Sequence, residues 1–157
     1  MTRFILAIAL MLMVSPAFAQ EQAAPIIPKK PEVPFREDAG LISAEYYLSV
    51  GKYSQALSVL AGVLERHPGS ADAYTYRGLA YQQLGDLKKA RDNYNRAVTL
   101  NPTHLGANKY LASMFLNDGE LDRAVEQMQV IRLACGTLEC QELDELQLEI
   151  NKFRAKQ

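Results

Sequence analysis

Residues 71–102 have the sequence ADAYTYRGLAYQQLGDLKKARDNYNRAVTLNP, and this stretch decides the fold. It divides at Gly85 into two stretches with amphipathic helical periodicity, and it ends at Pro102. Glycine adopts the left-handed backbone that ends a helix, whereas proline cannot continue a helix interior. The stretch therefore predicts two helices, 71–84 and 87–100, that fold back on each other as a hairpin.

The same pattern occurs three times at a constant spacing. This spacing equals the distance along the chain from Gly51 to Gly85, and we call it the period. Shifting the chain by one period superposes turn residues on turn residues: Gly51, Gly85 and Gly119, then Pro68 and Pro102, with Gly136 in the third place. It also superposes small residues on small residues: Ala44, Gly78 and Ala112, then Ala56, Ala90 and Ala124. Self-similarity at one period is the signature of a repeat architecture. The repeat predicts six helices, over 38–50, 53–66, 71–84, 87–100, 105–117 and 121–134.

The order of small, aromatic, Gly, Ala, aromatic, Ala and Pro positions in these copies resembles the tetratricopeptide repeat family. Residues 37–68 and 71–102 follow the pattern closely, while the third copy has Gly136 where the family often has Pro. The resemblance implies an all-α fold, a right-handed solenoid of three helical hairpins. We assign the hairpins to 37–70, 71–104 and 105–138.

A seventh helix is expected within 139–157. Leu143, Leu146, Ile150 and Phe153 recur at spacings of three and four, which places them on one face of a helix. A solenoid needs a terminal element that covers its last apolar face, so we interpret this helix as a cap. A helix that binds a partner is the alternative. The acidic residues of 139–149 are interpreted as the solvated face of the cap.

Cys135 and Cys140 lie in the turn between the last repeat and the cap. They predict a disulfide that joins these two elements. A redox-active pair is the alternative, but the cysteines are separated by four residues instead of the two of a thioredoxin-like motif. The short tail with its cysteine pair resembles that of small exported repeat proteins of Gram-negative bacteria.

Residues 1–19 are typical of a secretory signal peptide. Arg3 precedes an apolar run over 4–14, and small residues at alternate positions end at Ala19. The run is shorter than the ~20 residues that cross a bilayer, so we expect cleavage after Ala19 and no stable membrane anchor afterwards. The predicted location is the periplasm, an oxidising compartment that favours a disulfide.

A proline-rich linker is expected over 20–36. Prolines recur there at every third residue: Pro25, Pro28, Pro31 and Pro34. A polyproline II helix has three residues per turn, so the segment should be extended and semi-rigid. We interpret it as a spacer, with a ligand for an aromatic groove as the alternative.

Composition argues against several classes of function. The 157 residues hold 17 Lys+Arg and 18 Asp+Glu, which is not the charge balance of a nucleic-acid-binding protein. Two histidines and two cysteines offer little for a metal site, and no phosphate-binding loop or nucleophile motif is present. We therefore expect no enzyme activity, no cofactor and no metal, and we interpret His67 and His104 as solvated loop residues.

The family resemblance implies that the first helix of each hairpin lines a concave groove that receives an extended peptide or a helix. The residues expected to face this groove are Ile42, Glu45, Asp72, Thr75, Tyr76, Leu79, Gln83, Lys109, Tyr110, Ser113 and Asn117. Tyr76 and Tyr110 lie one period apart, and they can contact a ligand or pack between hairpins.

Some members of the family clamp a C-terminal carboxylate with Lys, Asn and Arg, and those residues are missing at the matching positions here. The mixture of Tyr, amide and hydroxyl side chains suggests a polar ligand without high charge. The predicted function is a non-enzymatic interaction module of the cell envelope that binds a protein partner. A structural protein associated with cell-wall glycan is the alternative.

Overall fold

The computed structural model describes residues 38–136 and 139–156. Within these ranges the chain forms helices and no strand. The helices are α1 (Ala39–Ser49), α2 (Tyr53–Arg66), α3 (Ala71–Gln83), α4 (Leu87–Leu100), α5 (Leu105–Asn117), α6 (Leu121–Cys135) and α7 (Gln141–Arg154). The predicted signal peptide (1–19) and proline-rich linker (20–36) lie outside the described residues.

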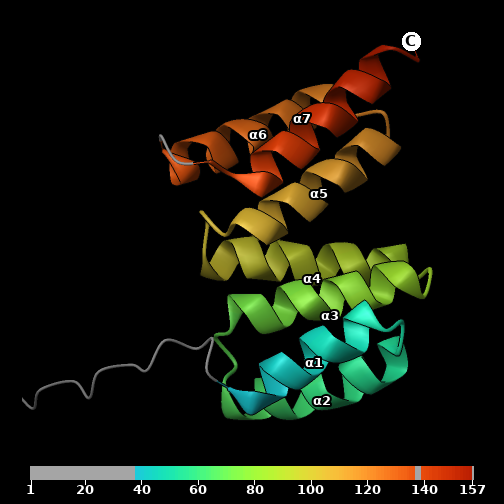
Figure 1. Cartoon of the computed structure of the whole chain (residues 1–157), viewed down its shortest axis with the longest axis vertical. Coiled ribbons are helices and arrows are strands. Elements are labelled where there is room, and N and C mark those ends of the chain that lie inside the picture. Colours follow the sequence, from blue (N-terminus) through green and yellow to red (C-terminus); the bar gives the residue numbers. More distant parts are fainter. Residues whose placement is uncertain (1–37, 137–138, 157) are drawn as a thin grey trace, which may run out of the picture. The chain divides into compact units, whose positions relative to one another are not determined.

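The six repeat helices form three hairpins that stack in chain order. α1 packs on α2, α3 on α4 and α5 on α6, and each hairpin also contacts the next through α2 with α3 and α4 with α5 (Figure 1). The predicted helix boundaries agree with the observed ones to within one residue. The all-α repeat solenoid is therefore confirmed.

The three first helices end in the same way. Gly51, Gly85 and Gly119 follow them with φ between 72° and 82°, a left-handed backbone that side chains disfavour. In each case the glycine N–H and the N–H after it bond back to carbonyls of the last helical turn, as in Gly51 to Leu48 and Lys52 to Tyr47. This pattern is the Schellman motif, and it reverses the chain so that the second helix returns along the first.

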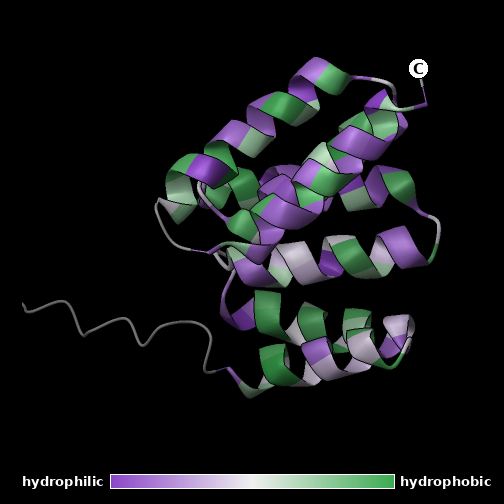
Figure 2. Ribbon diagram, turned by 45° about the horizontal axis from the view of Figure 1, so that its top comes forward, coloured by the Kyte–Doolittle hydropathy of each residue, from purple (hydrophilic) through white to green (hydrophobic). Residues whose placement is uncertain are grey.

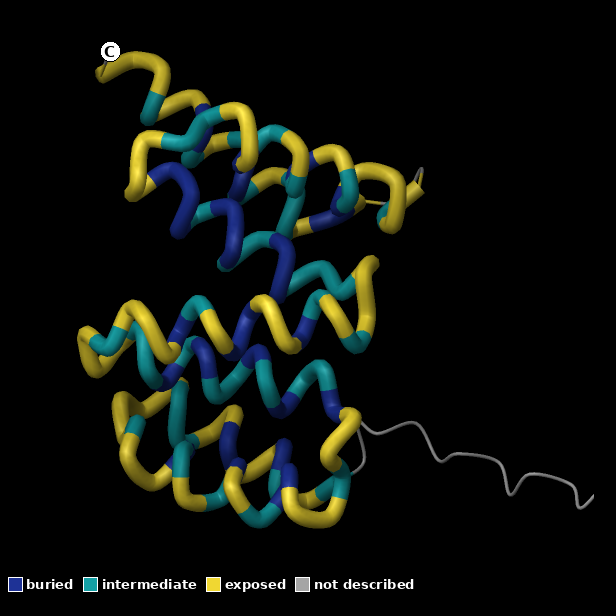
Figure 3. The backbone as a smooth tube through the Cα atoms, turned by 180° about the vertical axis from the view of Figure 1, so that it is seen from behind, coloured by how far each residue is buried: buried dark blue, intermediate teal, exposed yellow. Residues whose placement is uncertain are grey.

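Small residues bring the two helices of each hairpin together. Ala44, Ala112, Ala56, Ala90 and Ala124 are fully buried, and Gly78 is buried among them. Each helix carries apolar and polar residues in alternation along its length (Figure 2), and the buried positions recur where helices face one another (Figure 3). Short side chains at these contacts let the helix backbones approach closely.

The C-terminal helix α7 contacts both α5 and α6, in the way that α3 contacts α1 and α2. Leu146 and Ile150 are fully buried there, which confirms the capping helix. The structure joins Cys135, the last residue of α6, to Cys140, the residue before α7, by a disulfide. α7 therefore takes the position of the first helix of a further hairpin. No second helix follows it among the described residues.

Candidate binding groove

A groove of about 480 Å³ opens between the first helices of the hairpins. Its walls come from α1, α3, α5, the turn that precedes α5, and the first turn of α7. The lining residues are Leu41, Ile42, Glu45, Asp72, Thr75, Tyr76, Asn101, Thr103, His104, Leu105, Gly106, Tyr110 and Glu142. The concave site inferred from the family resemblance thus has a physical counterpart in the chain.

The groove contains some of the residues predicted to face it and lacks others. Those that line it are Ile42, Glu45, Asp72, Thr75, Tyr76 and Tyr110. Those that lie elsewhere are Leu79, Gln83, Lys109, Ser113 and Asn117. Thr75 is 2% exposed and its hydroxyl donates to the Ala71 carbonyl, so it forms part of the floor and offers little surface to a ligand.

Lys109 and Ser113 on α5 face α7. The Lys109 ammonium donates to the Glu145 carboxylate, and the Ser113 hydroxyl donates to Glu149. These two contacts correct the interpretation of the acidic stretch 139–149 as a solvated face, because two of its carboxylates bind α5. They also correct the assignment of Lys109 and Ser113 to an open groove, since the cap covers this part of the inner surface.

The Lys109–Glu145 pair shifts the titration of both groups. Burial of Lys109 opposes its charged form, but the hydrogen bond to Glu145, together with the electrostatic interactions with Tyr110, Glu145 and Glu149, outweighs this effect and raises the Lys109 pKa. The same hydrogen bond lowers the pKa of Glu145 from its ordinary 4.5. The stability that Glu145 contributes is therefore present above that value and is lost as the pH falls through the acidic range.

A second cavity, of about 300 Å³, lies between α5 and α7. Ser113 and Asn117 line it together with Lys152, Phe153 and other residues of the cap. The predicted site residues at the C-terminal end of α5 therefore belong to this separate cavity.

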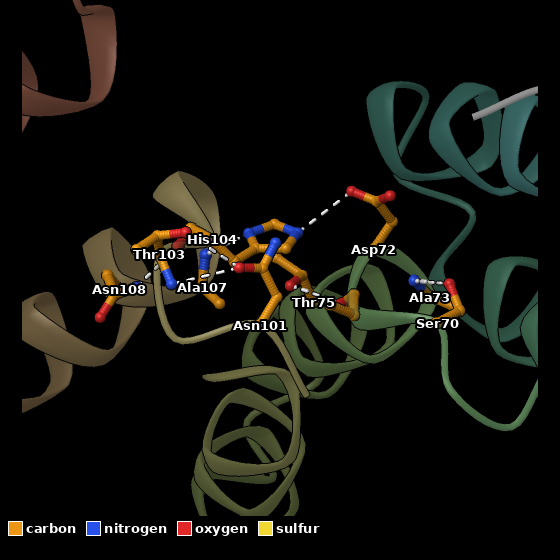
Figure 4. Close-up of polar contacts among 10 residues, drawn as sticks. Ser70, Asp72, Ala73, Thr75, Asn101, Thr103, His104, Ala107 and Asn108 are labelled. Carbon is orange, nitrogen blue, oxygen red and sulfur yellow. Dashed lines mark hydrogen bonds and ion pairs between the residues drawn. The ribbon is translucent and has the colours of Figure 1, made fainter. Parts of the chain in front are cut away.

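His104 joins α3 to α5 at the edge of the groove. Its Nδ1 accepts the Ala107 N–H at 3.2 Å, and its Nε2 lies 3.1 Å from an Asp72 carboxylate oxygen (Figure 4). An imidazole that accepts through Nδ1 carries its proton on Nε2, so the hydrogen bonds assign a neutral ring that donates to Asp72. The prediction that His104 is a solvated loop residue is wrong, since its side chain is only 15% exposed.

The repeat contains a signal that could have located His104. Ser70, which lies one period earlier, is the N-cap of α3 and accepts the Ala73 N–H through its hydroxyl. His104 takes the same position before α5. Asn108 supports this corner from inside, because its buried amide donates to the carbonyls of Pro102 and His104. His67 is also not simply solvated, since its Nε2 lies 3.3 Å from Asp38.

Replacing His104 by Ala is expected to destabilise the protein by about 1 kcal/mol, because the helix loses its N-cap and Asp72 loses a donor. His104→Asn should have a smaller effect, since an Asn oxygen can still accept the Ala107 N–H. Urea unfolding measures both changes. ¹⁵N spectra of the native protein should show the Nε2–H tautomer, and a dominant Nδ1–H form would contradict the assignment.

The two groove tyrosines differ in their packing. The Tyr110 ring stacks on that of Tyr94, with centroids 5.4 Å apart and planes inclined by 18°. Tyr94 is fully buried and donates to Gln82 at 2.8 Å, and burial raises the pKa of its phenol. Tyr110 therefore packs between hairpins and lines the groove at once. Tyr76 is half-buried, and it also combines packing against the core with a place in the groove wall.

Residues 38–136 and 139–156 contain no cluster of three or more His, Cys, Asp or Glu side chains suited to a metal ion. In the same part of the chain, none of the helices combines the length and apolar character that a membrane span requires.

The comparisons with known proteins agree with this geometry. Residues 71–104 match the model of the tetratricopeptide repeat. The chain also aligns with the TPR2B domain of yeast Sti1, solved as a pHsp70 complex, at a TM-score of 0.66 and 18% identity, over 75% of this chain and 95% of that domain. The chain is a tetratricopeptide repeat protein.

Two further known proteins are similar to this repeat protein, one in structure and one in sequence. The first TPR domain of Spaghetti (RPAP3), bound to the HSP90 peptide SRMEEVD, aligns at a TM-score of 0.62 and 20% identity, over 74% of this chain and 90% of that one. The co-chaperone DNJ1 of Fusarium oxysporum, which has tetratricopeptide repeats and a J domain, is 30% identical over 69% of this chain. The chain spans only 21% of that relative's length.

Proposed function

We propose that this tetratricopeptide repeat protein is a non-enzymatic interaction module of the bacterial cell envelope. In this proposal it binds an extended polypeptide segment of a partner in the groove between α1, α3 and α5. The observation that carries the proposal is the groove itself, which is open, about 480 Å³ in volume, and formed by the first helix of each hairpin.

Two features support the proposal. The Spaghetti (RPAP3) domain, which shares the fold, is bound to a seven-residue peptide, and the volume of the groove in this chain lies within the usual range of ligand-binding clefts. The signal-peptide pattern over 1–19 and the disulfide between Cys135 and Cys140 are both typical of an exported protein.

Gly106 offers a direct test, because it lines the groove and a Cβ there would meet only ordinary contacts, at 3.6 Å or more. Gly106→Trp should occupy part of the groove and reduce peptide binding at least ~10-fold, since the indole takes up space that the ligand needs. Circular dichroism should show unchanged helix content. The measurement is the affinity of the mature chain for peptides selected from a random decapeptide library.

Leu133→Trp is the matched control, since Leu133 is highly exposed on α6 and outside the groove. It adds the same indole to the surface and should leave peptide affinity unchanged. Equal binding by Gly106→Trp and the native chain would exclude the groove as the site.

A further inference from the structure

The charged side chains that line the groove are acidic. Glu45 of α1, Asp72 of α3 and Glu142 of α7 contribute three carboxylates from three helices, and the lining includes no Lys or Arg. Charges of one sign on the walls of a cleft raise the local concentration of oppositely charged ligands. This finding differs from the expectation of a polar ligand without high charge.

Two neighbouring groups could add positive charge to the groove, and neither does so in the observed hydrogen bonding. Lys109 is the basic residue among those predicted to face the groove. Its ammonium is paired with Glu145 of the cap. His104 is neutral in its observed hydrogen bonding and donates to Asp72, which leaves the charge of that carboxylate in place. The residues that line the groove therefore carry a net negative charge.

The uncharged part of the wall also suits long cationic side chains. Ile42 is 60% exposed at the groove, and it offers an apolar surface for the aliphatic stem of a Lys or Arg. Tyr76 adds an aromatic ring to the wall, whereas the Tyr110 ring is already in contact with Tyr94, on which it stacks, and with the Lys109 ammonium, 4.7 Å from its centroid. Cations are attracted to the faces of such rings.

We infer that the groove selects a cationic extended segment of a partner protein, whose Lys or Arg side chains approach Glu45, Asp72 and Glu142. This inference rests on the proposed function and names the chemical class of its ligand. It separates this chain from the Spaghetti (RPAP3) domain, whose peptide SRMEEVD carries three acidic side chains and a single Arg.

The test compares the peptides that the mature protein retains from a random decapeptide library at low ionic strength, using mass spectrometry. Lys and Arg should be enriched at least ~3-fold over the input in retained peptides, because the carboxylates favour them. The triple variant Glu45→Gln, Asp72→Asn and Glu142→Gln should lose this enrichment. Asn at position 72 can still accept the His104 proton, so the corner of the groove stays intact.

A second triple variant, Glu65→Gln, Asp122→Asn and Glu126→Gln, is the matched control. It removes the same charge from exposed positions of α2 and α6, away from the groove. A lysine-rich peptide from the selection should bind the groove variant at least ~10-fold more weakly than the native chain and should bind the control within ~2-fold.

The outcomes distinguish the ligand class from the proposed function. Enrichment of neutral or acidic peptides that Gly106→Trp still blocks would overturn the cationic ligand and keep the groove as a binding site. Retention of no peptide, or of peptides that bind Gly106→Trp equally well, would overturn both. Enrichment of Lys and Arg that persists in the groove triple variant would also overturn the inference, because the charges would then lie elsewhere.

Discussion

Replacing Leu146 by Ala is expected to destabilise the protein by about 2–5 kcal/mol, because truncation removes apolar burial and leaves a cavity. Leu146 is fully buried where α7 meets the last hairpin. The position lies one period after Ala112, where the complete repeats carry a small residue. No second helix follows α7 among the described residues, so a large side chain fills the space that a helix partner occupies in the hairpins.

Leu148→Ala is the control within the same helix. Leu148 is 53% exposed, so the same chemical change should alter stability by less than about 0.5 kcal/mol. Urea unfolding gives the total change, and amide hydrogen exchange shows whether α7 opens before the hairpins. If Leu146→Ala and Leu148→Ala had equal effects, α7 would not be a packed part of the solenoid.

The helices could be predicted from the sequence because their signals are local. Amphipathic periodicity defines each helix, Gly51, Gly85 and Gly119 end the first helices, and Pro68 and Pro102 follow the second ones. Three copies at one period reinforce each signal. The boundaries of the repeat helices were therefore predicted to within one residue, and the hairpin stack followed from the known geometry of such repeats.

The details of the groove could not be predicted in the same way, because they depend on which faces of distant helices meet. Periodicity showed that α7 is amphipathic but not that its polar side contacts α5. Lys109 and Ser113 were therefore assigned to an open surface, although Glu145 and Glu149 bind them. The same limit explains Glu142, whose place in the groove depends on the position of α7.

His104 shows a different limit. Its place near Pro102, and the lack of a second His or carboxylate at metal-ligand spacing on the same helix, suggested a solvated loop residue. The interpretation did not use the register of the repeat, in which His104 is equivalent to Ser70, the N-cap of α3. In a repeat chain, structural equivalence at the period is the better guide to a residue's local role.

The covered end of α5 has a consequence for the ligand. The cap binds Lys109 and Ser113, so the open groove ends near Tyr110. In the proposed binding mode a segment would contact the first two turns of α3 and α5 and the side of α1, and it would not extend along the whole inner face. Truncation of Tyr110 is a poor test of ligand contact, because it also uncovers the buried ring of Tyr94.

Replacing Gly78 by Ala is expected to destabilise the protein by about 1–3 kcal/mol, although Ala has the higher helix propensity. A Cβ at this position would lie 2.5 Å from Cε1 and 2.7 Å from Cδ1 of Tyr94. The ring cannot move aside, because it stacks on Tyr110 and its hydroxyl is bonded to Gln82. Gly106→Ala is the control, since its Cβ would meet no atom closer than 3.6 Å, and it should change stability by less than about 1 kcal/mol.

The repeat itself suggests how to rescue this defect. At the positions equivalent to Gly78 and Tyr94, the first hairpin carries Ala44 and Leu60 and the third carries Ala112 and Met128. The middle hairpin has the smallest residue opposite the largest.

Tyr94→Met alone should destabilise the protein, because it leaves a void beside Gly78 and Tyr110. Combined with Gly78→Ala it recreates the pair of the third hairpin, so the double variant should be more stable than the sum of the two single changes implies, by about 1 kcal/mol or more. Additive effects in urea unfolding would show that Gly78 is not there to accommodate Tyr94.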